Sequence, residues 1–216
     1  MRKANEEKPD LVVSDVMMPL MSGMEMCMKI KNNIDLCHIP VVLLTALDSV
    51  EYNIEGLQQG ADDYISKPFH AKVLLMRCNN LIRNRLLLKS QLTKQVDFDV
   101  QLLATTSLDQ QLLNRIVEIV DQRMGEPDFD VNALARELNM GRSSFFTKVK
   151  NLTGMTPSEF MQNQRINRAA TLLREQPDLL LNEISDRLGF SSTVYFSRCF
   201  KAKFGVSPAQ FRKKEQ

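Results

Sequence analysis

The feature that most constrains this chain is a segment that occurs twice within residues 131–214. When the segment is shifted by 51 positions, Phe145 falls on Phe196 and Gly154 falls on Gly205. Each copy has the apolar periodicity of two short helices separated by a tight turn, and each closes with a glycine. A pattern repeated at a fixed spacing indicates one supersecondary unit used twice. The sequence therefore predicts two helix-turn-helix units in an all-α domain.

Both copies end in a signal for the start of a further helix. Thr156 and Ser207 stand at the N-cap, and each is followed by a proline at the first helical position. Glu159 and Gln210 lie three residues after these caps, the spacing of a capping box. We therefore expect a long helix over about 157–174 to join the two units.

The two parts of the chain carry opposite net charge. Residues 131–216 hold 14 basic and 7 acidic side chains, a net charge of +7, whereas the other 130 residues hold 14 basic and 19 acidic ones, a net charge of −5. A basic module beside an acidic one favours a polyanionic partner for the basic half alone. The alternative is a solvated bundle that happens to be basic, in which repeat, charge and turn spacing coincide by chance.

Two stretches within the repeat resemble a known family. The first is LNMGRSSFFTKVK (138–150) with LTGMTP (152–157), and the second is GFSS (189–192), YFSRCFK (195–201) and FGVSP (204–208). Together they resemble the two helix-turn-helix motifs of AraC-type transcription factors over roughly residues 109–214. In that family two recognition helices of one monomer enter successive major grooves of double-stranded DNA, about 34 Å apart.

Helical periodicity separates the core face of each recognition helix from its outer face. The residues expected in the core are Phe145, Val149 and Leu152 in the first helix and Phe196, Phe200 and Phe204 in the second. The outward candidates for DNA binding are Arg142, Ser143, Phe146, Thr147 and Lys150 in the first helix and Thr193, Val194, Ser197, Arg198 and Lys201 in the second.

Three pairs of equivalent positions resemble the base-contacting positions of the family: Ser143 with Val194, Phe146 with Ser197, and Thr147 with Arg198. Arg198 suits a bidentate contact to a guanine edge, and Phe146 and Val194 suit a thymine methyl group. Lys150 and Lys201 suit phosphate groups, which position a helix without reading sequence. For Phe146, packing in a second apolar layer is the alternative.

Residues 11–88 alternate short apolar strands with helical patterns. We expect strands at 11–13, 41–44 and 63–65 and helices at 23–32, 50–59 and 71–88. This alternation favours an α/β fold with a parallel sheet covered on both faces. Asp15, Thr45 and Lys67 follow the strands, and functional groups of such sheets gather at the carboxyl ends. Together they suit phosphoryl transfer, whereas singly they would be a loop aspartate, a helix-capping threonine and a surface lysine.

Three motifs of this region, LVVSDVMMPLMSG (11–23), PVVLLTA (40–46) and GADDYISKPF (60–69), resemble those of CheY-like response-regulator receiver domains. By position, the resemblance implies that Asp15 is the phosphoacceptor and a ligand of Mg²⁺. It also implies a switch hydroxyl at Thr45, a phosphoryl contact at Lys67 with a cis bond to Pro68, a switch aromatic at Tyr64, and a backbone carbonyl ligand of Mg²⁺ at Met17.

The sequence departs from the receiver family before Asp15. Receivers begin with a strand that ends in a pair of Mg²⁺-binding acids, then a helix and a second strand, yet only fourteen residues precede Asp15. Glu6, Glu7 and Asp10 are too close in sequence to form that pair and fit the tail of the second helix. We therefore expect a truncated doubly wound sheet with residues 11–14 as an exposed edge, and weak metal binding and phosphorylation. We also expect the chain to be a fragment of a longer protein.

Composition predicts the domain boundaries. We expect a receiver at 1–88 without its first strand, first helix and second strand, a polar linker at 89–108 and a DNA-binding domain at 109–216. Ser107 is expected to cap a helix over 109–124 that Gly125 closes.

Several classes of protein are disfavoured. The chain has no apolar run of 18 residues, its opening is too polar for a signal peptide, and its four cysteines are scattered. We expect reduced thiols and a cytoplasmic location, which includes the cytoplasmic end of a membrane-anchored hybrid sensor kinase.

These patterns predict a transcription regulator, not an enzyme, in which phosphorylation of the receiver controls the DNA-binding domain in the intact parent. The expected partners are double-stranded DNA, a cognate histidine kinase, a second copy on DNA and RNA polymerase. One alternative is a phosphorylation-independent truncated regulator or a fragment of a hybrid sensor histidine kinase, and another is an interaction protein that uses the exposed strand edge. An enzyme that hydrolyses its own aspartyl phosphate is disfavoured, because the acid pair is missing.

Overall fold

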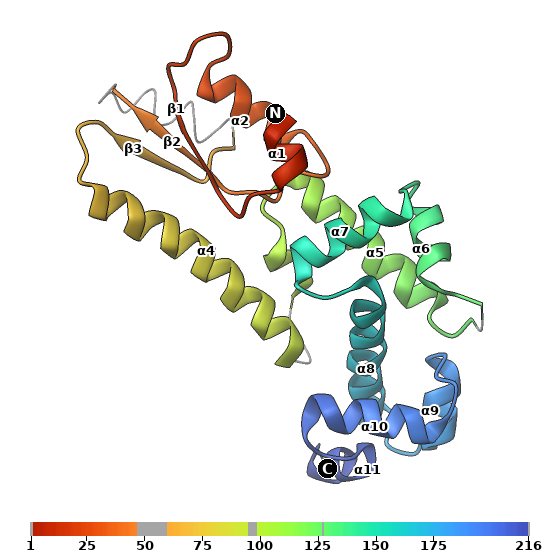
Figure 1. Cartoon of the computed structure of the whole chain (residues 1–216). Helices are drawn as coiled ribbons and strands as arrows, with labels where there is room; N and C mark the ends of the chain where they lie inside the picture. The colour runs from red at the N-terminus through yellow and green to blue at the C-terminus, as the bar shows by residue number, and fades with distance from the viewer. Residues whose placement is uncertain (1, 47–59, 95–98, 127, 216) are drawn as a thin grey trace. The chain divides into compact units, whose positions relative to one another are not determined.

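The structure, a computed structural model, describes residues 2–46, 60–94, 99–126 and 128–215 (Figure 1). It divides into two compact units, and their boundary runs through α4 and α5. The N-terminal unit comprises residues 1–88 and 102–111, and the C-terminal unit comprises residues 89–101 and 112–216. The helix expected over 50–59 lies outside the described residues.

The N-terminal unit is built on a parallel three-stranded sheet with the order β1-β2-β3 among the described residues. The strands are β1 (Val12–Asp15), β2 (Val41–Thr45) and β3 (Asp63–Ser66). All five residues of β2 are wholly or largely buried, whereas β1 lies at one edge and its Val13 is 41% exposed. The parallel sheet and the exposed apolar edge are therefore confirmed.

The helices α1 (Arg2–Glu7) and α2 (Gly23–Lys31) lie wholly in the N-terminal unit, and α4 (Ala71–Lys94) lies mostly in it. Ser22 and Glu25 form a capping box at the start of α2. The core forms where Cys27 and Ile30 of α2 pack against β2. The helix α4 continues past residue 88, where the sequence pattern predicted its end.

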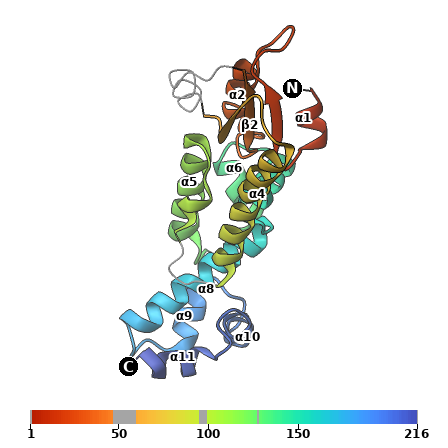
Figure 2. The same ribbon diagram turned by 90° about the vertical axis from the view of Figure 1, so that its left-hand side faces the viewer.

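The remaining elements are helical. They are the 3₁₀ helix η1 (Val100–Leu103), α5 (Ser107–Arg123), α6 (Val131–Glu137), α7 (Arg142–Thr153), α8 (Pro157–Glu175), α9 (Leu181–Arg187), α10 (Thr193–Phe204) and α11 (Pro208–Glu215). The pairs α6–α7 and α9–α10 are the two predicted helix-turn-helix units. Figures 1 and 2 both show α9, α10 and α11 gathered about one end of α8.

The two helix-turn-helix units differ by one residue in the turn. The second helices, which begin at Arg142 and Thr193, are 51 positions apart, but the first helices, which begin at Val131 and Leu181, are 50 apart. The offset of 51 thus holds for the second helices and for the segments that follow them, but not for the first helices, because the second turn is one residue longer. The C-cap glycines that follow α7 and α10 both have left-handed backbones, with φ of 78° and 72°.

The predicted capping boxes start α8 and α11. The backbone N–H of Glu159 donates to the Thr156 hydroxyl, and the backbone N–H of Gln210 donates to the Ser207 hydroxyl. The prediction for α5 was wrong by a residue, because the hydroxyl that accepts the N–H of Asp109 is that of Thr106, not Ser107. No helix in the described ranges is long and apolar enough to cross a membrane.

Candidate functional sites

The three residues expected at the carboxyl edge of the sheet lie there. Asp15 and Thr45 are the last residues of β1 and β2, and Lys67 directly follows β3. The Nζ atom of Lys67 lies 2.5 Å from Oδ1 of Asp15, and Thr45 is buried. A carboxylate that faces an ammonium group at the open edge of a parallel sheet is suited to bind and orient a phosphoryl group.

The backbone around Asp15 is closely packed. A Cβ atom on Gly23 would lie 2.1 Å from the carbonyl oxygen of Asp15, so only glycine fits at the start of α2. The N–H of Gly23 donates to the Val16 carbonyl at 2.8 Å. The peptide bond between Lys67 and Pro68 is cis, as predicted.

Tyr64 lies within β3, two residues before the edge. Its hydroxyl donates to the sulfur of Met24 at 3.3 Å, and burial raises the pKa of Tyr64 to about 12. The ring packs against the core shared by α2 and β2. The structure thus holds Tyr64 inward, on the face of the sheet that α2 covers.

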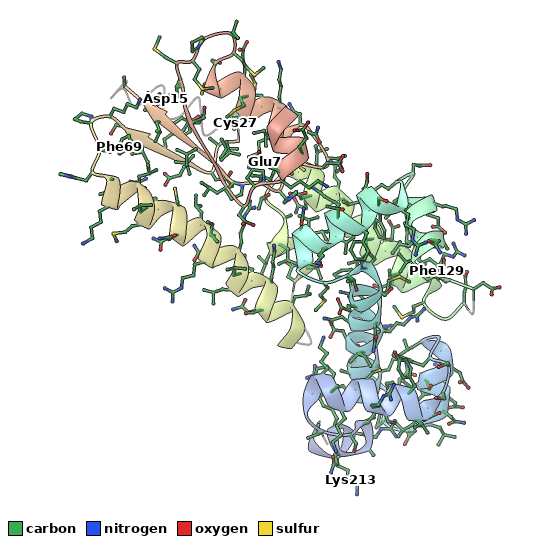
Figure 3. The ribbon with its side chains drawn as sticks, in the orientation of Figure 1. Glu7, Asp15, Cys27, Phe69, Phe129 and Lys213 are labelled. Atoms are coloured by element: carbon green, nitrogen blue, oxygen red, sulfur yellow. The ribbon has the colours of Figure 1, made fainter. Side chains whose placement is uncertain are left out.

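The residues described do not form a complete Mg²⁺ site. Figure 3 shows Asp15 on the same side of the unit as Phe69, while Glu7 lies on α1. Asp10 precedes β1 and Asp15 ends it, so the two acids are separated by the whole strand, which is about 10 Å long at roughly 3.3 Å per residue. No cluster of three metal-binding acids, histidines or cysteines occurs in the described ranges, and the Met17 side chain is 80% exposed. Asp15 therefore does not belong to a group of three or more such side chains in the described ranges.

Sequence reasoning missed a buried ion pair near the amino ends of β2 and β3. The Nζ atom of Lys31 donates to the Ile39 carbonyl at 3.0 Å and to Oδ2 of Asp62 at 2.6 Å. The same carboxylate accepts the N–H of Val41 at 2.8 Å, and Arg85 lies 3.7 Å from its other oxygen. The sequence feature that could have revealed this ion pair is Asp62, an acid that directly precedes β3.

The outer face of α7 contains the five predicted DNA contacts. Phe145, Val149 and Leu152 are buried, which confirms the core face. The exposed or half-exposed residues on the other face are Arg142, Ser143, Phe146, Thr147 and Lys150. The side chain of Lys148 is 1% exposed, so this lysine belongs to the interior, although its charge alone would suggest a DNA contact.

The outer face of α10 repeats this arrangement. Phe196 and Phe200 are buried, whereas Phe204 is half-buried against Phe200 and Phe211, with ring centroids 4.6 and 5.5 Å apart. The predicted contacts on the other face are Thr193, Val194, Ser197, Arg198 and Lys201, of which Thr193 and Ser197 are half-exposed and the others exposed.

Arg198 has a defined position on this face. Its guanidinium carbon lies 5.2 Å from the ring centroid of Tyr195, a cation–π contact that orients the long side chain. Val194, one turn earlier, is 82% exposed.

Family models match each part of the chain. A response regulator receiver domain matches residues 1–79, and a helix-turn-helix domain matches residues 134–214. Among curated proteins, Histidine kinase P4 of Formosa agariphila is 42% identical over 212 residues, which cover 98% of this chain and 15% of the kinase. The HTH-type transcriptional regulator MtrA of Neisseria gonorrhoeae is 27% identical over 173 residues, 80% of this chain and 55% of that regulator.

Among solved structures, the C-terminal domain of AraT, a response regulator from Geobacillus stearothermophilus, is similar to this chain with 27% identity and a TM-score of 0.44. The match covers 48% of this chain and 84% of that one. The chain therefore spans 15% of the length of the Formosa kinase and 55% of the length of the Neisseria regulator.

Proposed function

We propose that this chain, which joins a response regulator receiver domain to an AraC-type helix-turn-helix domain, reads the sequence of double-stranded DNA through α7 and α10. The observation that supports this most strongly is the repeated outer face of the two helices. Thr147 and Arg198 occupy equivalent positions 51 residues apart, each on a helix whose opposite face is buried.

The length of α8 suits two readers on one duplex. This helix has 19 residues, which corresponds to about 28 Å at roughly 1.5 Å per residue. Successive major grooves on one face of B-DNA are about 34 Å apart. With one reader near each end of α8, a single chain fits two neighbouring grooves.

We assign base contacts and phosphate contacts to different residues. Arg198 is proposed to bind a guanine edge, and Phe146 and Val194 to contact thymine methyl groups. Lys150 and Lys201, one turn further from the helix starts, are proposed to neutralise phosphates. The net charge of +7 over residues 131–216 supports strong, salt-dependent attraction to DNA.

The receiver domain is proposed to supply the regulatory input. Asp15 would accept the phosphoryl group, Lys67 would contact it, and Thr45 would respond to it. Because the described residues contain no group of three or more metal-binding acids, histidines or cysteines, we propose that the remaining metal ligands and the phosphorylation control belong to a longer parent. The similarity to a histidine kinase over 98% of this chain supports such a parent, with a histidine kinase as partner. Dimerisation on DNA and contact with RNA polymerase are proposed in addition.

Selection of binding sites from random duplex DNA, followed by titrations over a range of salt, tests the proposed reading of DNA. We expect one enriched sequence, and we expect Lys150→Ala and Lys201→Ala each to weaken binding and lower the salt slope by about one. Lys72→Ala, an exposed lysine in the receiver part, is the matched control and should change neither quantity. Failure to enrich any sequence would contradict the proposal.

A further inference from the structure

A cavity of about 330 Å³ lies in the C-terminal unit. It is bounded by α8, by the segment that leads into α6, and by the turn before α10. Its large apolar side chains are Phe129, which Figure 3 labels, Met161 and Phe190. Two residues that carry hydroxyl groups, Ser158 and Tyr195, also line it. A concave apolar wall with a few polar groups is the usual composition of a small-molecule site.

The cation that lines this cavity is Arg165 of α8. Its Nη1 makes a long hydrogen bond of 3.4 Å to the Gly189 carbonyl, and its buried Nε has no hydrogen-bond partner. No carboxylate lies within ion-pair distance of it among the residues that the structure describes. Burial lowers the pKa of Arg165. A half-buried guanidinium with an unpaired Nε donor is stabilised by an anion that accepts a hydrogen bond from it.

The acid that lines the same cavity is engaged elsewhere. Asp130 is the N-cap of α6, where its carboxylate accepts the N–H of Ala133 at 2.8 Å and the side-chain amide of Asn132 at 2.9 Å. It therefore stays ionised and adds one negative charge to the rim. A doubly charged ligand such as a phosphate monoester would be repelled by Asp130, so a single negative charge matches Arg165 better.

The wall of the cavity is held in place by backbone contact. Gly189 has a φ of 68°, and a Cβ atom there would lie 2.2 Å from the Met124 carbonyl. The ring of Phe190 packs 5.3 Å from that of Phe196, a buried residue of α10. These contacts fix the position of the wall, which reduces the free energy lost on ordering.

We propose that this cavity binds a small organic carboxylate, whose carboxyl group accepts hydrogen bonds from Arg165 while its apolar body contacts Phe129 and Phe190. A DNA phosphate is a poorer occupant, because a strongly hydrated diester on a stiff backbone does not fill a concave apolar wall. The cavity touches the start of α6 and the first turn of α10, so an occupant lies between the two helix-turn-helix units. If the ligand also changes the affinity for DNA, that effect rests on the proposed function. Binding of the ligand itself does not depend on the proposed function.

Calorimetric titration of the whole chain with 3-phenylpropionate, in the absence of DNA, tests the proposal. We expect saturable binding below about 10 mM, a loss of at least about tenfold in Arg165→Gln, and partial retention in Arg165→Lys. Arg168→Gln is the matched control, since Arg168 is an exposed arginine one turn along α8 that does not line the cavity. It should bind as the unchanged chain does. The neutral analogue 3-phenylpropanamide should bind at least about tenfold more weakly.

A second variant guards against loss of folding in Arg165→Gln. Ser158→Phe adds an apolar ring at an exposed position that lines the cavity, and we expect it to block binding while circular dichroism stays unchanged. No saturable binding, equal binding of the amide, or undiminished binding to folded Arg165→Gln and Ser158→Phe would overturn the proposal. A lower salt slope for DNA in Arg165→Gln, without carboxylate binding to the unchanged chain, would instead make Arg165 a phosphate contact and would also overturn it.

Discussion

The Nζ atom of Lys67 lies 2.5 Å from Oδ1 of Asp15 where the parallel sheet ends. The two side chains are 41% and 43% exposed, so the pair contributes at most about 1 kcal/mol to stability. Its importance is electrostatic, because the charged partner of Asp15 is an ammonium group. We propose that this arrangement suits a phosphoryl group better than a divalent cation.

Metal binding at Asp15 should therefore be weak in this chain. We expect titration with Mn²⁺, followed by paramagnetic broadening of the amide signals near Asp15, to show no saturation below about 1 mM, since affinity rises with the number of charged ligands. Asp15→Asn should abolish the residual broadening. Saturation well below that concentration would show that the site contains acids other than the one identified.

Substitution of Gly23 should destabilise the receiver domain. A Cβ atom there meets the Asp15 carbonyl oxygen at 2.1 Å, so we expect Gly23→Ala to lower the free energy of unfolding by about 1–3 kcal/mol. Gly141→Ala is the control, because nothing lies within 4 Å of a Cβ atom at that position. It should cost less than about 1 kcal/mol. Urea denaturation measures both, and equal losses would refute the steric explanation.

Two adjacent phenylalanines should have opposite effects. Phe145 is 1% exposed and Phe146 is 42% exposed. We expect Phe145→Ala to lower the free energy of unfolding by about 3–5 kcal/mol. Phe146→Ala should lower it by less than about 1 kcal/mol but weaken binding to a selected DNA site. A stability loss in Phe146→Ala as large as that in Phe145→Ala would instead support packing in a second apolar layer.

Much of this fold could be predicted from local sequence chemistry. The capping box of Thr156 and Glu159 and the buried spacing of Phe196 and Phe200 depend on neighbours three or four residues away, so the sequence alone predicts them. The parallel strands could be predicted for a similar reason, because β2 is a continuous apolar run bounded by turn residues. The repeat predicted the positions of α7 and α10 along the sequence.

Features that depend on distant partners could not be predicted. The local sequence around Lys31 predicts a surface lysine. Its ammonium group is buried because the fold places the Ile39 carbonyl and the Asp62 carboxylate next to it. The extra residue in the second turn could not be predicted from the repeat. The apolar residues of α7 and α10 align the two copies at an offset of 51, and this offset does not show that α6 and α9 are 50 residues apart. Nor does any local pattern show that Arg165 faces a cavity, since the walls come from three separate segments.

The stability of the C-terminal unit should depend on the ionisation of Lys203. Its Nζ atom donates to the side-chain oxygens of Asn163 and Asn167, and burial lowers its pKa to about 8, whereas an unfolded lysine has a pKa of about 10.4. Between these values the unfolded state binds more protons. The free energy of unfolding should therefore rise with pH, by at most about 1.4 kcal/mol per pH unit.

Urea unfolding between about pH 7.5 and pH 9.5 checks this dependence. The rise should be absent in Lys203→Met and retained in Lys201→Met, because Lys201 is exposed on the same helix. Contributions from other groups, such as Cys27, whose pKa burial raises to about 11, are common to all three proteins and cancel in the comparison. Parallel pH profiles for the unchanged chain and Lys203→Met would contradict the assignment.

The most direct test of sequence reading by this chain compares Arg198→Ala with the unchanged chain on a selected duplex and on a scrambled duplex of equal length. Titration by fluorescence anisotropy gives the four affinities at one salt concentration. Because a bidentate arginine–guanine contact exists only on the correct sequence, we expect a loss of about 1–3 kcal/mol on the selected duplex and little change on the scrambled one. An equal loss on both duplexes, or none on either, would contradict the proposal that Arg198 reads a base.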